Sequence, residues 1–238
     1  QTSGSSGEPA NREVTKHAMQ KSAEMTAQYF NCGAGTHALL ALPSSFIAGK
    51  MMLVRAMTQG WKLTAIAPTA TPLENLRESF SFAAFTPMQL ATLTDAQLEL
   101  VSRFGAVLIG GAAVSDALHN RLTSVDGNFY ETYGMAETLS HVAVRRIQVQ
   151  EVPFKALHGV HFLVDENQCL QIDAPHVSSS IIQTSDVVDL QDNTAFYYRG
   201  RFDRMINSGG VKLHAEIIER KLAGAVDVPY LVVSERDN

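Results

Sequence analysis

The sequence predicts an α/β protein, in which a largely parallel sheet covered by helices is followed by a small antiparallel, β-barrel-like subdomain. Two observations carry this prediction. Over residues 1–144, short apolar runs typical of buried strands alternate with helical patterns, an order typical of a parallel sheet with helices on both faces. Over residues 145–202, short β-like runs are separated by polar turns, which favours antiparallel hairpins or a small barrel.

In the first part, buried strands are predicted at residues 37–42, 62–67, 82–85 and 106–109. Helices are predicted at residues 14–29, 47–59 and 115–123, and Gly60 is expected to end the second of them. Three further segments, at Thr71, Thr86 and Thr94, carry capping patterns that predict helix starts. Residues 128–141 then read as a strand that ends at a corner loosened by glycine.

In the second part, strands are predicted at residues 160–164, 170–172, 181–183 and 195–198. The segment Ser208-Gly209-Gly210 follows, and its glycines would let the chain pivot. Residues 211–222 have a helix-like apolar pattern.

The composition excludes several classes of function. The 238 residues carry a net charge of −5 with a pI of about 5.9, so no basic field is available to bind nucleic acid. No apolar run reaches the roughly 18 residues of a membrane span. The two cysteines, Cys32 and Cys169, cannot build a disulfide framework, so a cytoplasmic location is expected. Because the sequence begins at Gln1 and stops just after an apolar run, it is expected to be part of a longer protein.

Candidate binding residues fall where strands are predicted to end. In a parallel sheet, ligands bind beyond the carboxyl ends of the strands, and both Gly110-Gly111-Ala112 and Tyr133-Gly134 lie at such ends. The Tyr133 ring suits a purine base, and Glu137 could hold a hard cation such as Mg²⁺. An ordinary strand end is the alternative interpretation.

Two other segments could bind parts of a nucleotide. Residues Thr2, Ser3, Gly4, Ser5, Ser6 and Gly7 could form a nest of backbone N–H groups for phosphates, although a linker or an expression-tag remnant looks the same. Asp186 and Arg201 stand in predicted hairpins, and a carboxylate can accept hydrogen bonds from both ribose hydroxyls. A solvated turn is the alternative for these charges.

These segments together, in this order, resemble the motifs of the adenylate-forming enzymes, which include acyl-CoA synthetases, luciferases and peptide-synthetase adenylation domains. Residues 2–9 resemble the phosphate loop of that family, and Gly110-Gly111-Ala112 its Gly-Gly-Ala/Glu loop. The segment Tyr133-Gly134-Met135-Ala136-Glu137 is similar to the family's Tyr-Gly-x-Thr-Glu. Residues 184–186 are similar to its ribose segment, and residues 200–206 to its hinge motif.

The resemblance implies a two-step reaction. A substrate carboxylate attacks the α-phosphorus of ATP to give an acyl-adenylate and pyrophosphate, and the thiolate of CoA then displaces AMP. It also implies roles for the residues: residues 2–7 for the phosphates, Tyr133 for the base, Gly110 to Ala112 for the adenine and acyl crevice, Asp186 and Arg201 for the ribose, and Glu137 for Mg²⁺. Gly134 and Met135 are also expected to bind the nucleotide. Residues 1–202 would form the large domain, and residues 203–238 the start of an α+β lid that turns about Asp203.

Within the family, residues 47–52, 133–141 and 206–212 are most similar to the 2-succinylbenzoate–CoA ligases of menaquinone synthesis. The resemblance places Phe46 and Gly49 at the acyl pocket, with Phe46 where the family commonly has histidine. A substrate of this class keeps one carboxylate that is not activated, and Lys50 or His141 is expected to pair with it. For Lys50, a surface lysine on a helix is the alternative.

Some family features differ here, and they leave other functions open. Ala10 and Ala136 stand where the family usually has lysine and threonine, and the lid lysine has no counterpart in this sequence. Another acyl- or aryl-CoA ligase, or a domain that loads a carrier protein, is one alternative; a nucleotide-binding remnant without activity is another. A homodimer is compatible with the sequence.

Overall fold

The computed structural model describes residues 13–74, 76–208, 211–222, 226 and 230–233. One sheet of eleven strands runs through the molecule in the order β2-β1-β3-β4-β5-β6-β7-β11-β10-β9-β8. Its first five strands pair in parallel and the others in antiparallel fashion, which confirms the predicted mixed α/β fold. The antiparallel strands, predicted as hairpins or a small barrel, continue the parallel sheet by hydrogen bonding between β5 and β6.

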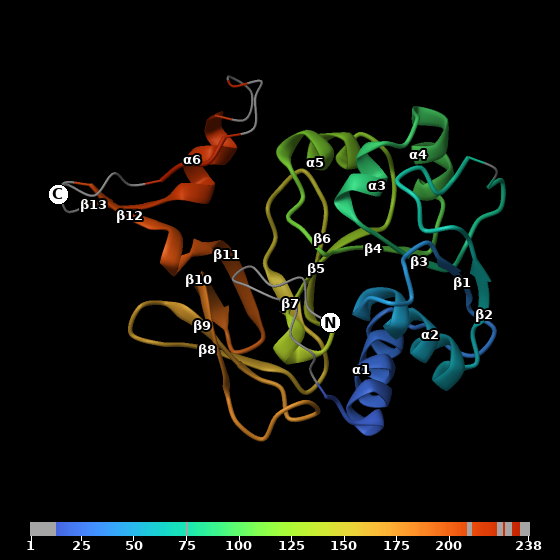
Figure 1. Cartoon of the computed structure of the whole chain (residues 1–238), viewed down its shortest axis with the longest axis horizontal. Coiled ribbons are helices and arrows are strands. Elements are labelled where there is room, and N and C mark those ends of the chain that lie inside the picture. Colours follow the sequence, from blue (N-terminus) through green and yellow to red (C-terminus); the bar gives the residue numbers. More distant parts are fainter. Residues whose placement is uncertain (1–12, 75, 209–210, 223–225, 227–229, 234–238) are drawn as a thin grey trace.

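Helices cover both faces of the parallel part (Figure 1). Its strands are β1 (His37–Leu40), β2 (Lys62–Ala65), β3 (Phe82–Phe85), β4 (Ala106–Ile109) and β5 (Phe129–Gly134). On one face lie α1 (Lys16–Tyr29) and α2 (Ile47–Gln59), and on the other α3 (Pro87–Ala91), α4 (Asp95–Ser102) and α5 (Asp116–Thr123). Because both faces are covered, all four residues of β4 are buried.

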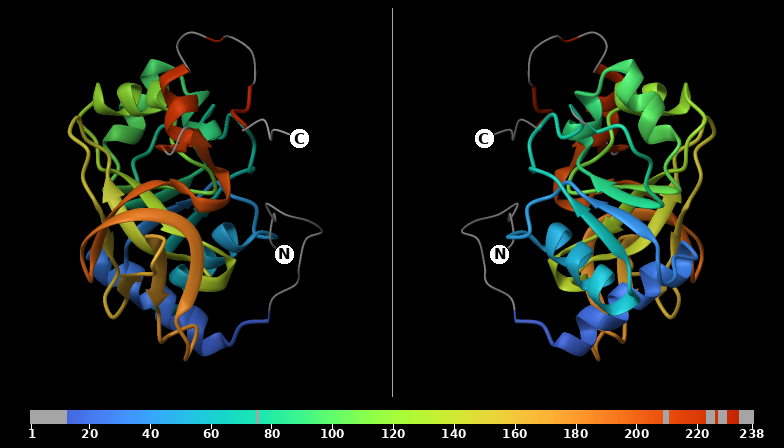
Figure 2. Two further views of the ribbon diagram at one scale, coloured as in Figure 1. Left: turned by 90° about the vertical axis from the view of Figure 1, so that its left-hand side faces the viewer. Right: turned by 90° about the vertical axis from the view of Figure 1, so that its right-hand side faces the viewer.

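The antiparallel part has its own apolar core, which includes Phe154, Phe162 and Phe196. Its strands are β6 (His141–Arg146), β7 (Phe154–Ala156), β8 (His161–Val164), β9 (Cys169–Asp173), β10 (Ile182–Asp192) and β11 (Ala195–Arg201). Helix α1 lies along the underside of the molecule (Figure 2) and contributes Met25 to this core and Ala27 to the core under α2. It therefore packs against both parts of the sheet.

A short segment follows the sheet. The 3₁₀ helix η2 (Phe202–Arg204) leads into a two-stranded antiparallel sheet, β12 (Met205–Ser208) and β13 (Val211–His214), and then into α6 (Ala215–Leu222). Arg204 ties this helix to the chain before it through ion pairs with Glu216 at 3.2 Å and Glu219 at 2.5 Å. Among the described residues, no helix is long and apolar enough to cross a membrane.

Two predictions of secondary structure were wrong. No helix begins at Thr71, where residues 72–74 form only a turn. The Thr71 hydroxyl donates to the Glu74 carboxylate (3.1 Å), and among the described residues no backbone N–H donates to it, unlike at Thr86 and Thr94. Residues 211–222 are not one helix either. Their first four residues pair with β12, a contact with an earlier strand that local periodicity does not reveal, and only Ala215–Leu222 is helical.

Gln89 links α3 to the loops that follow β1 and β2. Its Nε2 donates to the carbonyls of Ala41 (2.9 Å) and Thr69 (3.0 Å), and its Oε1 accepts from the Thr86 N–H (3.0 Å). Because these bonds are buried or half-buried, we expect Gln89→Ala to lower the free energy of unfolding by about 2–4 kcal/mol. Urea unfolding checks this.

Gln97→Ala is the matched control for that measurement. Gln97 completes the same capping box at the start of α4, with Oε1 accepting from Thr94 N–H at 2.8 Å, but it has no such bonds to distant carbonyls among those described. Its loss should cost about 1 kcal/mol or less. Equal effects of the two substitutions would show that the distant bonds of Gln89 contribute nothing.

Candidate functional site

The loop after β4 brings bare backbone to the carboxyl end of the parallel sheet. A Cβ on Gly110 would lie 2.4 Å from Thr132 Oγ1, so only glycine allows β4 and β5 to approach so closely there. Thr132 Oγ1 donates to the Ile109 carbonyl at 3.0 Å. Gly111 has φ +87°, a left-handed conformation that favours glycine. Ala112 follows as an exposed residue. The backbone of Gly110 to Ala112 is therefore accessible to a flat ligand.

Glu131 anchors the other end of this loop. Its Oε1 accepts from the Val114 N–H at 3.4 Å, and its Oε2 pairs with Arg145 at 2.6 Å. The guanidinium of Arg145 lies 4.5 Å from the centre of the Phe154 ring. This half-buried ion pair was not expected from the sequence, because nothing local to Glu131 marks it as more than a strand residue.

Tyr133 and Asp186, which are 53 residues apart in the sequence, meet at the end of β5. The Tyr133 hydroxyl donates to Asp186 Oδ2 at 2.5 Å. The Tyr133 ring packs against Phe154 and Phe196, with ring centres 5.8 Å and 5.1 Å away. Burial and the neighbouring Asp186 carboxylate raise the pKa of Tyr133 well above its usual value, so its hydroxyl stays protonated as a donor. Two of the residues predicted to bind the nucleotide are therefore in direct contact.

Arg201 joins the same cluster from the adjacent strand. It is the register partner of Asp186, and its guanidinium lies 4.0 Å from Asp186 Oδ1. It binds Asp203 through two contacts, 2.9 Å and 2.6 Å long. These contacts raise the pKa of Arg201 and lower that of Asp203. Burial raises the pKa of Asp186, and the Tyr133 and Arg201 contacts oppose that shift. Asp203 lies in η2, directly after β11 of the large sheet. Its role as the hinge stays a prediction.

The connection between β5 and β6 is tight and strained. A Cβ on Gly134 would lie 2.5 Å from the Ser140 carbonyl oxygen, so this turn requires glycine. Met135 precedes the 3₁₀ helix η1 (Ala136–Thr138), in which Glu137 lies. Leu139 is buried with φ +67° and ψ −49°, a conformation that bulky residues rarely adopt. Such strain is concentrated at functional sites and is held here by the packing of Leu139 against α1 and α2.

Directly after this strained residue, Ser140 and His141 meet a buried arginine. Arg55, on α2, is only 3% exposed and donates from Nη2 to Ser140 Oγ at 3.2 Å. Its Nε is buried with no hydrogen-bond partner, and no carboxylate of the described residues lies within ion-pair distance. Burial lowers the pKa of Arg55 to about 10. A buried guanidinium with no carboxylate partner among the described residues can bind an anion.

His141 is hydrogen-bonded through both ring nitrogens. Its Nε2 lies 3.2 Å from Thr26 Oγ1 on α1, and its Nδ1 lies 3.4 Å from Ser140 Oγ. Burial and the nearby Arg55 hold the pKa of His141 well below its usual value, so the ring is neutral. The ring can donate or accept hydrogen bonds, and its pairing with a substrate carboxylate stays a prediction.

The other residues predicted at the acyl pocket lie at the beginning of α2. Phe46 is the residue before the helix and is 51% exposed, Gly49 is buried, and Lys50 is exposed. The structure does not bring Lys50 to His141. Residues Thr2, Ser3, Gly4, Ser5, Ser6, Gly7 and Ala10, the predicted phosphate loop and its departure from the family, lie outside the described residues.

Arg55 and Thr26 are the residues that sequence reasoning missed. Both lie on the buried faces of their helices, Arg55 beside Met51 and Met52, and Thr26 one turn after Ser22. A charged residue in the apolar stripe of α2 was a signal that could have been found, because residues three or four apart share a helix face. The partner of Thr26 is 115 residues away, and no local pattern indicates it.

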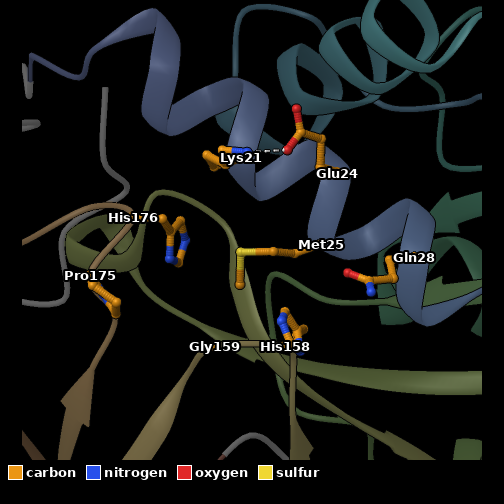
Figure 3. A pocket seen from close by; sticks show the side chains of 8 residues that line it. All are labelled: Lys21, Glu24, Met25, Gln28, His158, Gly159, Pro175 and His176. Carbon is orange, nitrogen blue, oxygen red and sulfur yellow. Dashed lines mark hydrogen bonds and ion pairs between the residues drawn. The ribbon is translucent and has the colours of Figure 1, made fainter.

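Within the described residues, no group of three or more histidine, cysteine, aspartate or glutamate side chains is arranged to hold a metal ion. A single carboxylate such as Glu137 is compatible with Mg²⁺, because that ion commonly takes one or two carboxylates together with phosphate oxygens and water. A cavity of about 250 Å³ (Figure 3) lies elsewhere, between α1 and the loops that carry His158 and His176. None of the predicted site residues lines it.

Comparisons with known proteins found a matching family model and similar solved structures. The family model described as AMP-binding enzyme matches residues 2–173. An acyl-CoA synthetase (AMP-forming)/AMP-acid ligase II-like protein from Dyadobacter fermentans is 41% identical, with a TM-score of 0.80 over 94% of this chain and 65% of that chain.

Two solved structures of O-succinylbenzoate coenzyme A synthetase (MenE) from Bacillus subtilis are also similar. The complex with AMP is 18% identical, with a TM-score of 0.80, covering 99% of this chain and 56% of that one. The complex with ATP and magnesium ion is 18% identical, with a TM-score of 0.73, covering 94% and 54%. At this identity the similarity shows the fold alone. The chain spans 65% of the length of the Dyadobacter fermentans protein and little more than half of the length of the two MenE chains. A comparison with curated proteins found no match.

Proposed function

This chain belongs to the AMP-binding enzyme family, and we propose that the protein activates a carboxylic acid with ATP and transfers the acyl group to CoA. In the first step a carboxylate oxygen bonds to the α-phosphorus of ATP and pyrophosphate leaves. In the second step the CoA thiolate bonds to the acyl carbon and AMP leaves. The observation that carries the proposal is the contact of Tyr133, Asp186 and Arg201 beside the Gly110 loop.

These residues suit a nucleoside. Asp186 is held by Tyr133 and faces Arg201, so its second oxygen can accept hydrogen bonds from ribose hydroxyls. The backbone of Gly110 to Ala112 can lie against the base. Residues 2–7 would hold the phosphates, and Glu137 would hold Mg²⁺, which neutralises phosphate charge when bound. The protein's own contribution is to position the reacting groups and to stabilise the charge that develops on phosphate.

The acid is proposed to be a dicarboxylate, with 2-succinylbenzoate as the best candidate. Arg55 supports this choice, because a buried guanidinium with an unpartnered Nε and no carboxylate neighbour among the described residues can bind the substrate carboxylate that is not activated. Arg55 thereby replaces His141 and Lys50 in that role: His141 is neutral and Lys50 is exposed. The resemblance of residues 133–141 to succinylbenzoate ligases points the same way.

Acid-dependent exchange of pyrophosphate into ATP tests this function, measured on the complete polypeptide that contains this sequence. We expect exchange with 2-succinylbenzoate, and CoA-dependent release of AMP. Exchange with only monocarboxylic acids would assign a different acyl-CoA ligase, and exchange without CoA-dependent release would favour a domain that loads a carrier protein. Nucleotide binding without exchange for any acid would favour a non-catalytic protein, the alternative that Ala136 leaves open.

A further inference from the structure

The hydrogen bonds around Arg55 form a chain with a single direction. The Thr26 hydroxyl has one proton, and it donates that proton to the Ser22 carbonyl at 3.0 Å. The Thr26 oxygen can therefore only accept from His141 Nε2, 3.2 Å away. This assigns the proton of the neutral His141 ring to Nε2 and leaves Nδ1 as an acceptor.

The remaining bonds follow from that assignment. His141 Nδ1 accepts from the Ser140 hydroxyl at 3.4 Å, which leaves the lone pairs of Ser140 Oγ to accept from Arg55 Nη2 at 3.2 Å. Each group thus donates a hydrogen bond to the next one: Arg55 to Ser140, Ser140 to His141, His141 to Thr26, and Thr26 to the main chain of α1. The strained Leu139 fixes the backbone just before Ser140.

From this chain we propose that Thr26 and His141 are positioning residues that hold Arg55 in place for the second carboxylate of a dicarboxylic acid. The inference rests on the proposed function. Arg55 needs such support, because a guanidinium at the end of a long side chain loses more conformational freedom on binding when it is not already fixed. Thr26 and His141 need not touch the substrate; they act through Ser140 on the orientation of Arg55.

Two chemically matched substitutions separate this role from a structural one. Thr26→Val removes the acceptor, and Thr26→Ser keeps it. Thr58→Val is the control, because Thr58 on α2 also donates to the carbonyl four residues before it (2.8 Å), yet it is exposed and outside the chain of bonds. Each variant is made in the complete polypeptide.

The first measurement compares KM and kcat for 2-succinylbenzoate with those for 4-oxo-4-phenylbutanoate, which has the same skeleton and one carboxylate. We expect Thr26→Val to raise KM for the dicarboxylate by about tenfold, the effect of roughly one hydrogen bond, with little change in KM for the monocarboxylate. Thr26→Ser and Thr58→Val should keep the selectivity of the unmodified protein. An equal loss for both acids would overturn the positioning role.

The second measurement does not depend on activity or on any variant folding. The ¹⁵N chemical shifts of the His141 ring distinguish its two tautomers, and we expect the proton on Nε2 in the unmodified protein. A proton on Nδ1 would overturn the inference.

The two proposals can fail separately. If Arg55→Met lowers selectivity for the dicarboxylate while Thr26→Val does not, the positioning role is wrong and the proposed substrate class stands. If Arg55→Met also leaves the selectivity unchanged, the proposed substrate class is wrong, and the inference falls with it.

Discussion

Arg55→Met is expected to raise KM for a dicarboxylic acid by about 10- to 100-fold without weakening the fold. The lost interaction is a charge-assisted hydrogen bond in a dry site, on the order of 1.5–3 kcal/mol, and 1.4 kcal/mol corresponds to a factor of ten. A monocarboxylic acid of the same skeleton has no group for Arg55 to bind, so its KM should change little.

Stability is expected to be unchanged or to increase, because Arg55 is costly to bury. Burial lowers its pKa to about 10, a shift on the order of 3 kcal/mol against the charged form. The folded state has the lower pKa and releases its proton first, so the unfolding free energy is reduced in full below pH 10 and recovers as the pH rises toward the unfolded-state pKa. At neutral pH, replacing such a charge by an apolar side chain of similar length is often neutral or stabilising.

Thermal unfolding with and without 2-succinylbenzoate provides the measurement that is independent of turnover. The ligand should raise the Tm of the unmodified protein and raise that of the variant much less. Arg103→Met is the control, because Arg103 is exposed and pairs with Glu99 at 3.1 Å. A marked loss of stability in Arg55→Met, with no change in the ligand's effect, would identify Arg55 as a structural residue.

The sequence was sufficient for the parts of the fold that local rules decide. Helix α2 has the predicted bounds, because Gly60 takes the left-handed conformation that ends a helix. The capping boxes at Thr86 and Thr94 are formed as predicted. Thr71 carries the same pattern, but its hydroxyl binds a side chain and not the backbone N–H, so the pattern alone did not suffice.

The candidate site divides in the same way. Motifs identified Tyr133, Asp186 and Arg201, and the structure brings these three together. The charged residue proposed for the second carboxylate was not marked by any motif. Lys50 and Arg55 share a helix, and only the apolar stripe around Arg55 indicates that it lies on the buried face. Distant pairings such as Thr26 with His141 depend on how α1 packs against β6, and no segment of the sequence specifies that packing by itself.

Asp186→Asn is expected to lower the affinity for AMP by about 10- to 100-fold, again without a loss of stability. The carboxylate would accept charge-assisted hydrogen bonds from ribose, and the amide that replaces it provides only a weaker acceptor. The amide oxygen can still accept from the Tyr133 hydroxyl, so the contact between the two strands is retained. Calorimetric titration with AMP measures the affinity, and Asp189→Asn on the same strand, exposed and paired with Arg199 at 2.6 Å, is the control.

The pH dependence of stability gives the second expected result for this variant. Burial raises the pKa of Asp186 in the folded state above its usual value of 3.8, so the folded state binds this proton more readily than the unfolded state does. Asp186 therefore lowers the unfolding free energy as the pH rises from its unfolded-state pKa to its folded-state pKa, and the reduction is complete above the folded-state pKa. The amide side chain of the variant does not titrate, so the variant should be at least as stable as the unmodified protein near neutral pH. A variant that bound AMP normally, or that was less stable than the unmodified protein at neutral pH, would show that Asp186 is held for the fold. Weaker AMP binding with unchanged or higher stability would show that Asp186, like Arg55, is a charge whose burial costs stability and serves binding.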